Sequence, residues 1–451
     1  MRPSVRSQKT EVPMKKLIFL LTIFLALAAL VYFYEIQGED RREETRKLEE
    51  SLLRISQDEI TALEISPFQK EILVLVREEN RWMIERPIRS IADMGTVGSL
   101  FRDLESASRD RILEDAGSEI KKYGLDFPRF RLAIDVGQER QTLLIGNEDF
   151  TGNSMYVQLE GDSEVFLTSR SLYTVVDKEL FQWRDKKVLA FERPQVQAIE
   201  LKNSEATIRL ERRNEEWFME APLHERADQN KVTGLLSTVE FAEVQEFVDD
   251  HSQELEPYGL FPAGATLRIQ VGDSQEWKTL ELGQDVGEYS WARNSDWPFV
   301  FTVQPELPER LNQTVWDFRD KSVVDVDQTE IARVLFRRGE EEIVIQYQDY
   351  TWIVEKPDSH KDQLAQAYKF WYPITDIAFQ SIDDDQSDGD SLLQPDVRMV
   401  VTFTDGVERT FVFVQTGGRY LAGKMNSGRQ GTISQADFEK LLFEIEDILD
   451  P

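Results

Sequence analysis

The stretch Trp82-Met-Ile-Glu-Arg-Pro87 recurs as Trp217-Phe-Met-Glu-Ala-Pro222 and again as Trp352-Ile-Val-Glu-Lys-Pro357. The three tryptophans are equally spaced along the chain. Their interval is too long for a solenoid repeat and is typical of a small domain. The sequence therefore predicts three tandem copies of one module in this chain of 451 residues.

The segments around each tryptophan repeat as well. Two short segments precede each tryptophan, and their β-branched composition is typical of half-buried strands. They are 60–65 and 72–76 in the first copy, 196–201 and 206–210 in the second, and 331–336 and 343–347 in the third. A helix is expected after the proline in the first two copies, because apolar residues fall on one face: Val97, Leu100 and Leu104, then Val232, Leu235 and Val239. Asp93 and Asp228 stand where they can cap these helices.

Two further phrases return at the same interval as the tryptophans. Tyr123-Gly-Leu125 matches Tyr258-Gly-Leu260, and Arg184-Asp-Lys186 matches Arg319-Asp-Lys321. The Arg-Asp-Lys phrases are expected to form ion pairs that lock one module against the next, with a docking patch as the alternative. The third copy has neither phrase, as expected of an atypical terminal module. The predicted fold class is α+β, with three β-rich modules of about 135 residues at 55–190, 191–325 and 326–451.

The N-terminal region predicts where these modules lie. Residues 17–34 carry no charge and are just long enough for a transmembrane helix. The tail 1–16 before them holds five basic residues and one acidic residue, so it is expected to stay cytoplasmic. Residues 35–54 predict a charged stalk. The protein is therefore expected in the cytoplasmic membrane as a single-pass protein, with its bulk in the periplasm.

Two alternatives remain for this region. Ala26-Leu-Ala28 offers a small-residue site at which a signal peptide is cleaved, although the apolar run continues to Tyr34. The charged segment 35–54 has only a thin apolar stripe, so it also fits a disordered linker.

Composition excludes several classes of chemistry. The chain has no cysteine, which excludes disulfides, cysteine-ligated metals and thiol catalysis. Its formal net charge of −31 argues against nucleic acid and against anionic lipid headgroups as partners. This acidity fits a solvated surface or a basic partner.

No motif predicts a catalytic, cofactor or metal site. Residues 418–424 resemble the start of a P-loop, but Met425 replaces the magnesium-binding hydroxyl and the segment is expected to be a strand. The acidic run 383–390 lacks a calcium-loop glutamate and is expected to be a solvated loop, with casual divalent binding as the alternative. Core or surface roles are expected for three other sets of residues that could carry chemistry: His224, His251 and His360; Glu85, Glu220 and Glu355; Trp291, Trp297 and Trp371.

The repeated phrases together resemble a bacterial family of domains of unknown function, best over residues 55–325 and weakly beyond. Members of that family are membrane-anchored exported proteins, often encoded beside gliding-motility-type ABC transporter genes. The resemblance carries no catalytic residues. It implies a non-catalytic auxiliary or scaffold component of an ABC-type transport complex, with permease or ATPase subunits as partners. The alternative is an envelope module that binds glycan or polymer through exposed tryptophans.

Overall fold

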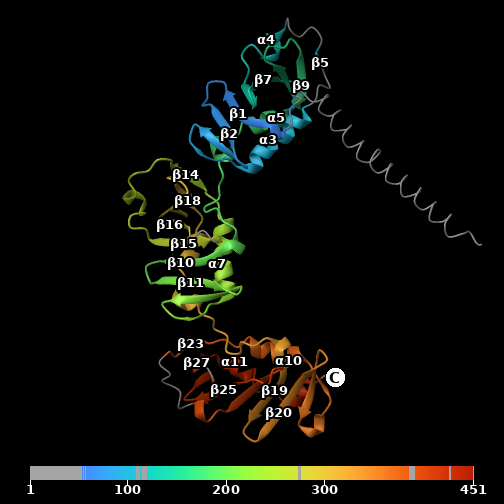
Figure 1. Ribbon diagram of the computed structural model, residues 1–451, viewed down its shortest axis with the longest axis vertical. Helices are drawn as coiled ribbons and strands as arrows, with labels where there is room; N and C mark the ends of the chain where they lie inside the picture. Colours follow the sequence, from blue (N-terminus) through green and yellow to red (C-terminus); the bar gives the residue numbers. More distant parts are fainter. Residues whose placement is uncertain are drawn as a thin grey trace, which may run out of the picture. The chain divides into compact units, whose positions relative to one another are not determined.

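The computed structural model describes residues 53, 55, 57–107, 112–113, 119–272, 276–384, 392–425 and 428–449. This part of the chain forms three nine-stranded sheets with a few short helices (Figure 1). The prediction of a β-rich α+β fold is therefore confirmed at that level. The expected tail 1–16, the transmembrane segment 17–34 and almost all of the stalk 35–54 lie outside the described residues.

The first sheet has the strand order β4-β3-β2-β1-β6-β7-β8-β9-β5, and its neighbouring strands pair antiparallel. Its strands are β1 (Ile60–Pro67), β2 (Leu73–Glu78), β3 (Arg81–Arg86), β4 (Ser90–Ile91), β5 (Ile112–Leu113), β6 (Phe130–Val136), β7 (Glu139–Glu148), β8 (Ser154–Leu159) and β9 (Val165–Ser169). Its helices are α3 (Met94–Ser106), α4 (Ile120–Tyr123), α5 (Arg170–Val176) and α6 (Leu180–Trp183).

The second sheet has the equivalent order β13-β12-β11-β10-β15-β16-β17-β18-β14. Its strands are β10 (Val196–Lys202), β11 (Thr207–Arg213), β12 (Glu216–Ala221), β13 (Glu225–Arg226), β14 (Glu246–Asp249), β15 (Ala265–Val271), β16 (Trp277–Val286), β17 (Tyr289–Asn294) and β18 (Val300–Val303). Its helices are α7 (Gln229–Phe241), α8 (Glu306–Leu311) and α9 (Val315–Phe318).

The third sheet repeats the order once more, as β22-β21-β20-β19-β24-β25-β26-β27-β23. Its strands are β19 (Ile331–Arg338), β20 (Glu341–Gln348), β21 (Thr351–Lys356), β22 (Leu364–Ala365), β23 (Ser381–Ile382), β24 (Val397–Phe403), β25 (Glu408–Thr416), β26 (Arg419–Lys424) and β27 (Arg429–Ile433). Its helices are α10 (Ala367–Thr375), α11 (Gln435–Glu439) and α12 (Ile445–Ile448). The third copy thus keeps the topology although it lacks two of the repeated phrases.

Each sheet face buries its own apolar cluster, because successive residues of a strand point to opposite faces. In the first sheet Leu143 packs in the cluster that α3 and α5 cover, whereas Leu144 packs with Tyr123 and Leu125 on the other face. In the third sheet Phe413 belongs to the cluster under α10, while Val412 faces a smaller cluster with Leu392. Helices and turns therefore cover both faces, at least in part.

The expected helices begin at the expected caps. Asp93 accepts a hydrogen bond from the backbone N–H of Thr96 at 2.7 Å, at the start of α3. Asp228 accepts from the backbone N–H groups of Asn230 and Lys231, both at 3.0 Å, at the start of α7. Each cap supplies an acceptor that the first helical turn lacks. The predicted apolar residues of both helices are buried: Val97, Leu100, Leu104, Val232, Leu235 and Val239.

The Tyr-Gly-Leu phrases form a tight turn against the sheet. Gly124 ends α4 and Gly259 ends a single 3-10 turn, Glu256–Tyr258, and both glycines have left-handed backbone angles, with φ of 69° and 66°. The carbonyl oxygen of the preceding tyrosine then lies against a second glycine, Gly146 on β7 and Gly283 on β16. A Cβ at either of these two glycines would overlap that oxygen. The repeated glycines are therefore required by close backbone packing.

Contacts gather the described chain into two compact units. The first comprises the residues up to Glu192 with Thr238–Thr266 and Trp277–Glu309. The second comprises Arg193–Ser237, Leu267–Glu276 and the residues from Arg310 onward. The boundary passes through the second sheet, so these units do not coincide with the three sheets. The following sections treat each unit by itself.

One residue of the expected stalk belongs to the first unit. Leu53 is buried and packs in the core of the first sheet. No helix within the described ranges is long and apolar enough to span a membrane.

Candidate functional site

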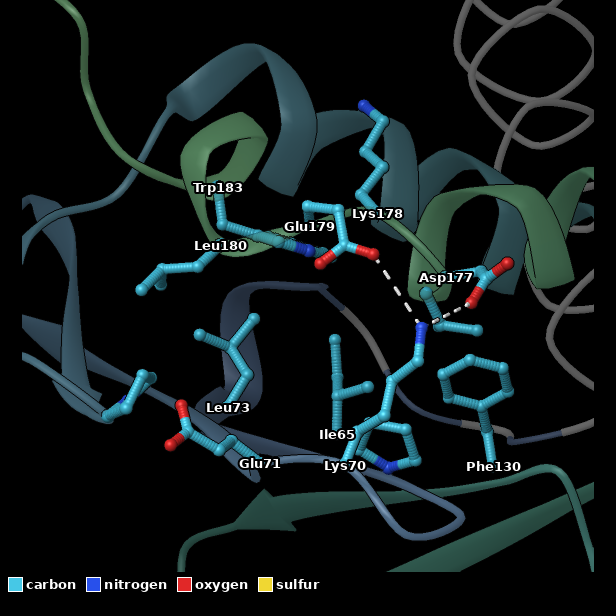
Figure 2. Close-up of a pocket in the computed structure, with 13 residues that line it drawn as sticks. Ile65, Lys70, Glu71, Leu73, Phe130, Asp177, Lys178, Glu179, Leu180 and Trp183 are labelled. Atoms are coloured by element: carbon cyan, nitrogen blue, oxygen red, sulfur yellow. Dashed lines mark ion pairs between the residues drawn. The ribbon is translucent and has the colours of Figure 1, made fainter. Parts of the chain in front are cut away.

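The first unit contains a pocket of about 360 Å³ beside the turn between β1 and β2. Apolar side chains line it, among them Ile65, Leu73 and Phe130 from the sheet and Leu180 and Trp183 from α6. Figure 2 shows Lys70 extending from the turn toward Asp177 and Glu179, which follow α5 and precede α6. The Lys70 Nζ lies 3.7 Å and 3.6 Å from these carboxylates.

Charged side chains border this pocket, with three carboxylates and two lysines. They are Glu71, Asp177, Glu179, Lys70 and Lys178. The two ion pairs of Lys70 are long, and the Lys70 and Glu179 side chains are largely exposed, so these pairs contribute little to stability. Breaking these two ion pairs to widen the pocket therefore costs little free energy. It can receive an apolar side chain from a polypeptide that also carries positive charge.

In the second copy, a polar side chain bridges the place where the first copy has its pocket. Asn203 corresponds to Pro67, because Leu201 pairs with Ile208 as Ile65 pairs with Leu73. The Asn203 side chain donates hydrogen bonds to the carbonyl oxygens of Leu311 and Gln313 at 3.0 Å and 2.9 Å. Pro67 instead lines the pocket without a polar side chain, and Phe68 after it is 56% exposed. The two copies thus share a fold but differ at this surface, and the first copy presents an apolar side chain beside its pocket.

The first Arg-Asp-Lys phrase contacts the strand that closes the second sheet. Arg184 is buried between two phenylalanine rings, with its guanidinium carbon 3.4 Å and 4.3 Å from the ring centres of Phe247 and Phe299. Its Nη1 donates to Asp250 at 2.6 Å. Burial lowers the pKa of Arg184 from its ordinary value, and the bond to Asp250 opposes that shift only in part. The contact joins residues of the first unit.

The second Arg-Asp-Lys phrase makes the same kind of contact in the second unit. Arg319 is also buried, and it pairs with Glu225 at 2.7 Å and with Asp384 at 2.7 Å. The expectation of ion pairs between consecutive copies is therefore confirmed for both arginines. Arg429 donates to the carbonyl oxygen of Asp320 beside this network. A cavity of about 560 Å³ lies next to it and is lined by several charged side chains.

Asp320 is the buried acid of this network. Burial opposes its ionisation, but hydrogen bonds from Ser322 and the ion pair with Arg226 at 2.8 Å outweigh burial, so the pKa of Asp320 is lowered. A depressed carboxyl pKa stabilises the fold above the ordinary value near 4, and this contribution is lost as the pH falls through the depressed value.

Acid should therefore open this junction. We expect amide protection around Asp320 to fall progressively below about pH 4, as measured by hydrogen exchange. Asp320→Asn should lower protection at pH 7 and reduce the dependence on pH below 4. An unchanged slope in this variant would assign the acid sensitivity to other carboxylates.

One residue of the acidic run 383–390 joins this network. The structure describes only Asp383 and Asp384 of the run, and Asp384 accepts two hydrogen bonds from Arg319, at 3.0 Å and 2.7 Å. The Asp384 side chain is 55% exposed, so it is solvated and also supplies a second carboxylate to the buried guanidinium. Arg319 also holds the pKa of Asp384 below its usual value.

The three histidines occupy separate places. His224 lies 3.4 Å from Glu220 and His360 lies 3.5 Å from Glu446, while the backbone N–H of His251 donates to Asp249. Within the described ranges, no group of three or more His, Cys, Asp or Glu side chains is arranged to hold a metal ion.

The repeated glutamates and the P-loop-like stretch have structural surroundings. Glu220 pairs with Arg213 at 2.7 Å and Glu355 with Arg333 at 2.6 Å, and Glu85 pairs with Arg89. Their strands bury Trp82, Trp217 and Trp352, as alternation predicts. The stretch ending at Lys424 is strand β26, and Lys424 pairs with Asp325 at 2.6 Å.

The three tryptophans considered as glycan platforms differ in exposure. Trp371 is buried in the third core, with its ring centre 5.7 Å from that of Trp352. Trp291 and Trp297 are half-buried, and Trp297 stacks on Phe299 at 5.6 Å. Only the latter two therefore present part of an aromatic ring to solvent.

Sequence reasoning did not find the pocket of the first copy or the partners of the two buried arginines. The pocket left only one signal, Pro67 at a position where the second copy has Asn203. The arginine partners lie 65 and 66 residues further along the chain, so no local pattern links them.

Comparison with known proteins gives a family and nothing more. A family model with the description "Domain of unknown function (DUF4340)" matches residues 82–222 and again residues 217–389. No curated protein and no solved structure matches the chain. Each family match begins at a tryptophan of the repeated phrase and runs across one Arg-Asp-Lys junction. These matches extend over more than half of the sequence, so the chain belongs to this family of domains of unknown function (DUF4340).

Proposed function

We propose that this protein is a non-catalytic envelope protein, anchored in the cytoplasmic membrane by residues 17–34, that acts as a scaffold or auxiliary component of an ABC-type transport complex. The pocket of the first copy is the surface at which it holds its partner. The observation that carries the proposal is the difference between the copies. Asn203 forms a hydrogen-bonded bridge in the second copy, whereas Pro67 at the same position of the first copy lines the pocket and is followed by exposed Phe68.

The chemistry of the pocket defines the partner segment. Its apolar floor accepts a leucine- or phenylalanine-sized side chain, and the excess of carboxylates on its rim favours a neighbouring lysine or arginine. A basic segment also complements the net charge of −31 on this chain. The proposed partner is therefore an extracytoplasmic segment of a permease subunit with an apolar residue beside a basic one.

Site-specific crosslinking in intact cells tests this assignment. A photoreactive phenylalanine analogue replaces Phe68 in the full chain, and Tyr350, which is 93% exposed in the turn between β20 and β21, serves as the control position. We expect the Phe68 probe to capture a permease subunit and the Tyr350 probe not to. Capture of no transporter subunit at Phe68, or equal capture at both positions, would contradict the proposal.

Reversing the rim charge should weaken this crosslink. Glu71→Arg is expected to reduce the yield about fivefold, because an exposed ion pair contributes up to about 1 kcal/mol. Glu105→Arg makes the same change of charge on the exposed side of α3, outside the pocket, and should leave the yield unchanged. An equal loss in both variants would indicate a general charge effect and no role for the pocket.

The alternative function is binding of envelope glycan or polymer. It would depend on Trp291 and Trp297, the two candidate tryptophans that keep part of their surface exposed. Recovery of cell-wall fragments in place of a transporter subunit, with loss on Trp297→Ala, would favour this function.

A further inference from the structure

The two Arg-Asp-Lys junctions differ in one carboxylate. Arg184 follows α6 and Arg319 follows α9, and each forms a β-bridge to the alanine that precedes the helix cap, Ala92 or Ala227. The two arginines therefore occupy the same position of the repeat. Each also donates to an aspartate that follows the last edge strand of the next copy, Asp250 or Asp384.

In the second unit, Glu225 occupies one edge of the guanidinium. The Arg319 Nε donates to Glu225 Oε1 at 2.7 Å and the Nη2 donates to Glu225 Oε2 at 3.2 Å. This is the two-point geometry that a planar guanidinium makes with a carboxylate. Together with Asp384, it uses all three nitrogens of Arg319.

In the first unit, Ser90 stands where Glu225 stands in the second. Ser90 pairs with Ile84 across β3 and β4, and Glu225 pairs with Met219 across β12 and β13, which is the same register one repeat further along the chain. A serine side chain is too short to reach the guanidinium as a glutamate does. The Arg184 Nε and Nη2 accordingly have no hydrogen-bond partner within the described part of the chain, and neither has the Ser90 hydroxyl.

These unpartnered groups are deeply buried. Arg184 is 2% exposed and Ser90 is 3% exposed. Asp250 bonds only the Nη1 of Arg184. A buried cation with two open donors is costly unless an acceptor reaches it. The same two nitrogens, Nε and Nη2, hold the carboxylate of Glu225 in the other junction.

We infer that Arg184 and Ser90 form a binding site for a small free carboxylate, of the size of formate, that takes the place of the Glu225 side chain. Both residues line a cavity of about 30 Å³. One water molecule needs about 10–15 Å³ by this measure, so the cavity admits a group of two or three heavy atoms. A carboxylate accepts from Nε and Nη2 together and also accepts from the Ser90 hydroxyl.

The site is lined by three phenylalanines, Phe247, Phe299 and Phe301, and also by the charged residues Asp185, Lys187 and Asp296. The phenylalanine rings strengthen a charge-assisted hydrogen bond. They also favour a small anion with one charged group over a larger polar ligand. The expected ligand is therefore a monocarboxylate, and its binding stabilises the contact between β4 and the end of the second sheet in the first unit.

The test uses sodium formate and the full chain purified in detergent, at constant ionic strength set with sodium sulfate. Saturation-transfer NMR observes the formate proton. We expect a saturable signal from the wild-type chain. Ser90→Glu supplies the missing carboxylate from the protein itself and should reduce the signal at least about fivefold. An equal signal in both proteins, or no signal from the wild type, overturns the proposal.

The reciprocal variant keeps the proposal testable if Ser90→Glu does not fold. Glu225→Ser recreates the open edge at Arg319 and should raise the formate signal about twofold. Arg429, whose Nη2 lies 3.7 Å from Glu225, adds a second cation to that new site. No gain in this variant counts against the inference. Displacement of formate by an equal concentration of chloride would overturn the assignment to carboxylates, because it would show that the site selects a small anion by charge alone.

Discussion

Arg319→Ala is expected to lower the free energy of unfolding of the second unit by about 3–5 kcal/mol, because truncating one partner of a buried ion pair leaves the other charge without compensation. Glu225 would lose the two bonds that hold it, at 2.7 Å and 3.2 Å. Asp384 would lose its guanidinium partner. Hydrogen exchange of the full chain measures the effect. Amides of β13 and of residues 318–322 should lose protection at least about 100-fold.

A surface arginine of the same unit provides the control. Arg209 pairs with Glu211 at 2.8 Å on β11, and its side chain is half-exposed. Arg209→Ala should cost less than about 1 kcal/mol, as exposed ion pairs do. If Arg319→Ala changes protection no more than Arg209→Ala does, then the Arg319 network does not hold this junction together.

Gly283→Ala is expected to destabilise the second sheet by about 3 kcal/mol, because overpacking of a close contact forces the backbone to shift. A Cβ at this position would overlap the carbonyl oxygen of Tyr258, and a backbone group cannot rotate away as a side chain can. The turn that ends at Gly259 would have to lift from β16. Differential scanning calorimetry of the full chain should show the corresponding transition about 6–12 °C lower.

The matched control lies in the same copy. Gly234 is inside α7, and a Cβ there would meet no atom within 4 Å. Gly234→Ala should therefore stabilise the protein by about 0.5–1 kcal/mol, since alanine favours the helix. A Gly283→Ala protein that melts with or above the wild type would show that the turn does not require close approach to the sheet.

Local patterns predicted the repeating part of this fold well. The β-branched segments marked strands β1 and β2 and their counterparts, and the apolar spacing marked α3 and α7 with their aspartate caps. These features depend on neighbours a few residues apart, which a single sequence displays directly.

Features that depend on distant residues were not predicted in the same detail. The sequence indicated that Arg184 and Arg319 form ion pairs, but it did not identify Asp250, Glu225 or Asp384 as their partners. Glu225 is one acid among 84 and carries no local mark of its role. The pocket of the first copy is likewise a property of packed surfaces, since its wall comes from β1, β6 and α6 together. The difference between the copies, Pro67 against Asn203, is the one trace of this pocket in the sequence, and it appears only once the strand pairing aligns the copies.

The placement of the two buried arginines has a consequence for biosynthesis. Arg184 is made 66 residues before Asp250, and Arg319 is made 65 residues before Asp384. While the ribosome extends the chain, Arg184 therefore waits for the next copy before its charge is matched, whereas Arg319 already has Glu225 and waits only for its second acid. A protein fragment cut at residue 190 or 325 would leave that arginine permanently without its later acid. Recombinant fragments of this protein should accordingly end beyond Phe299 or beyond Asp384, and not at the apparent ends of the repeats.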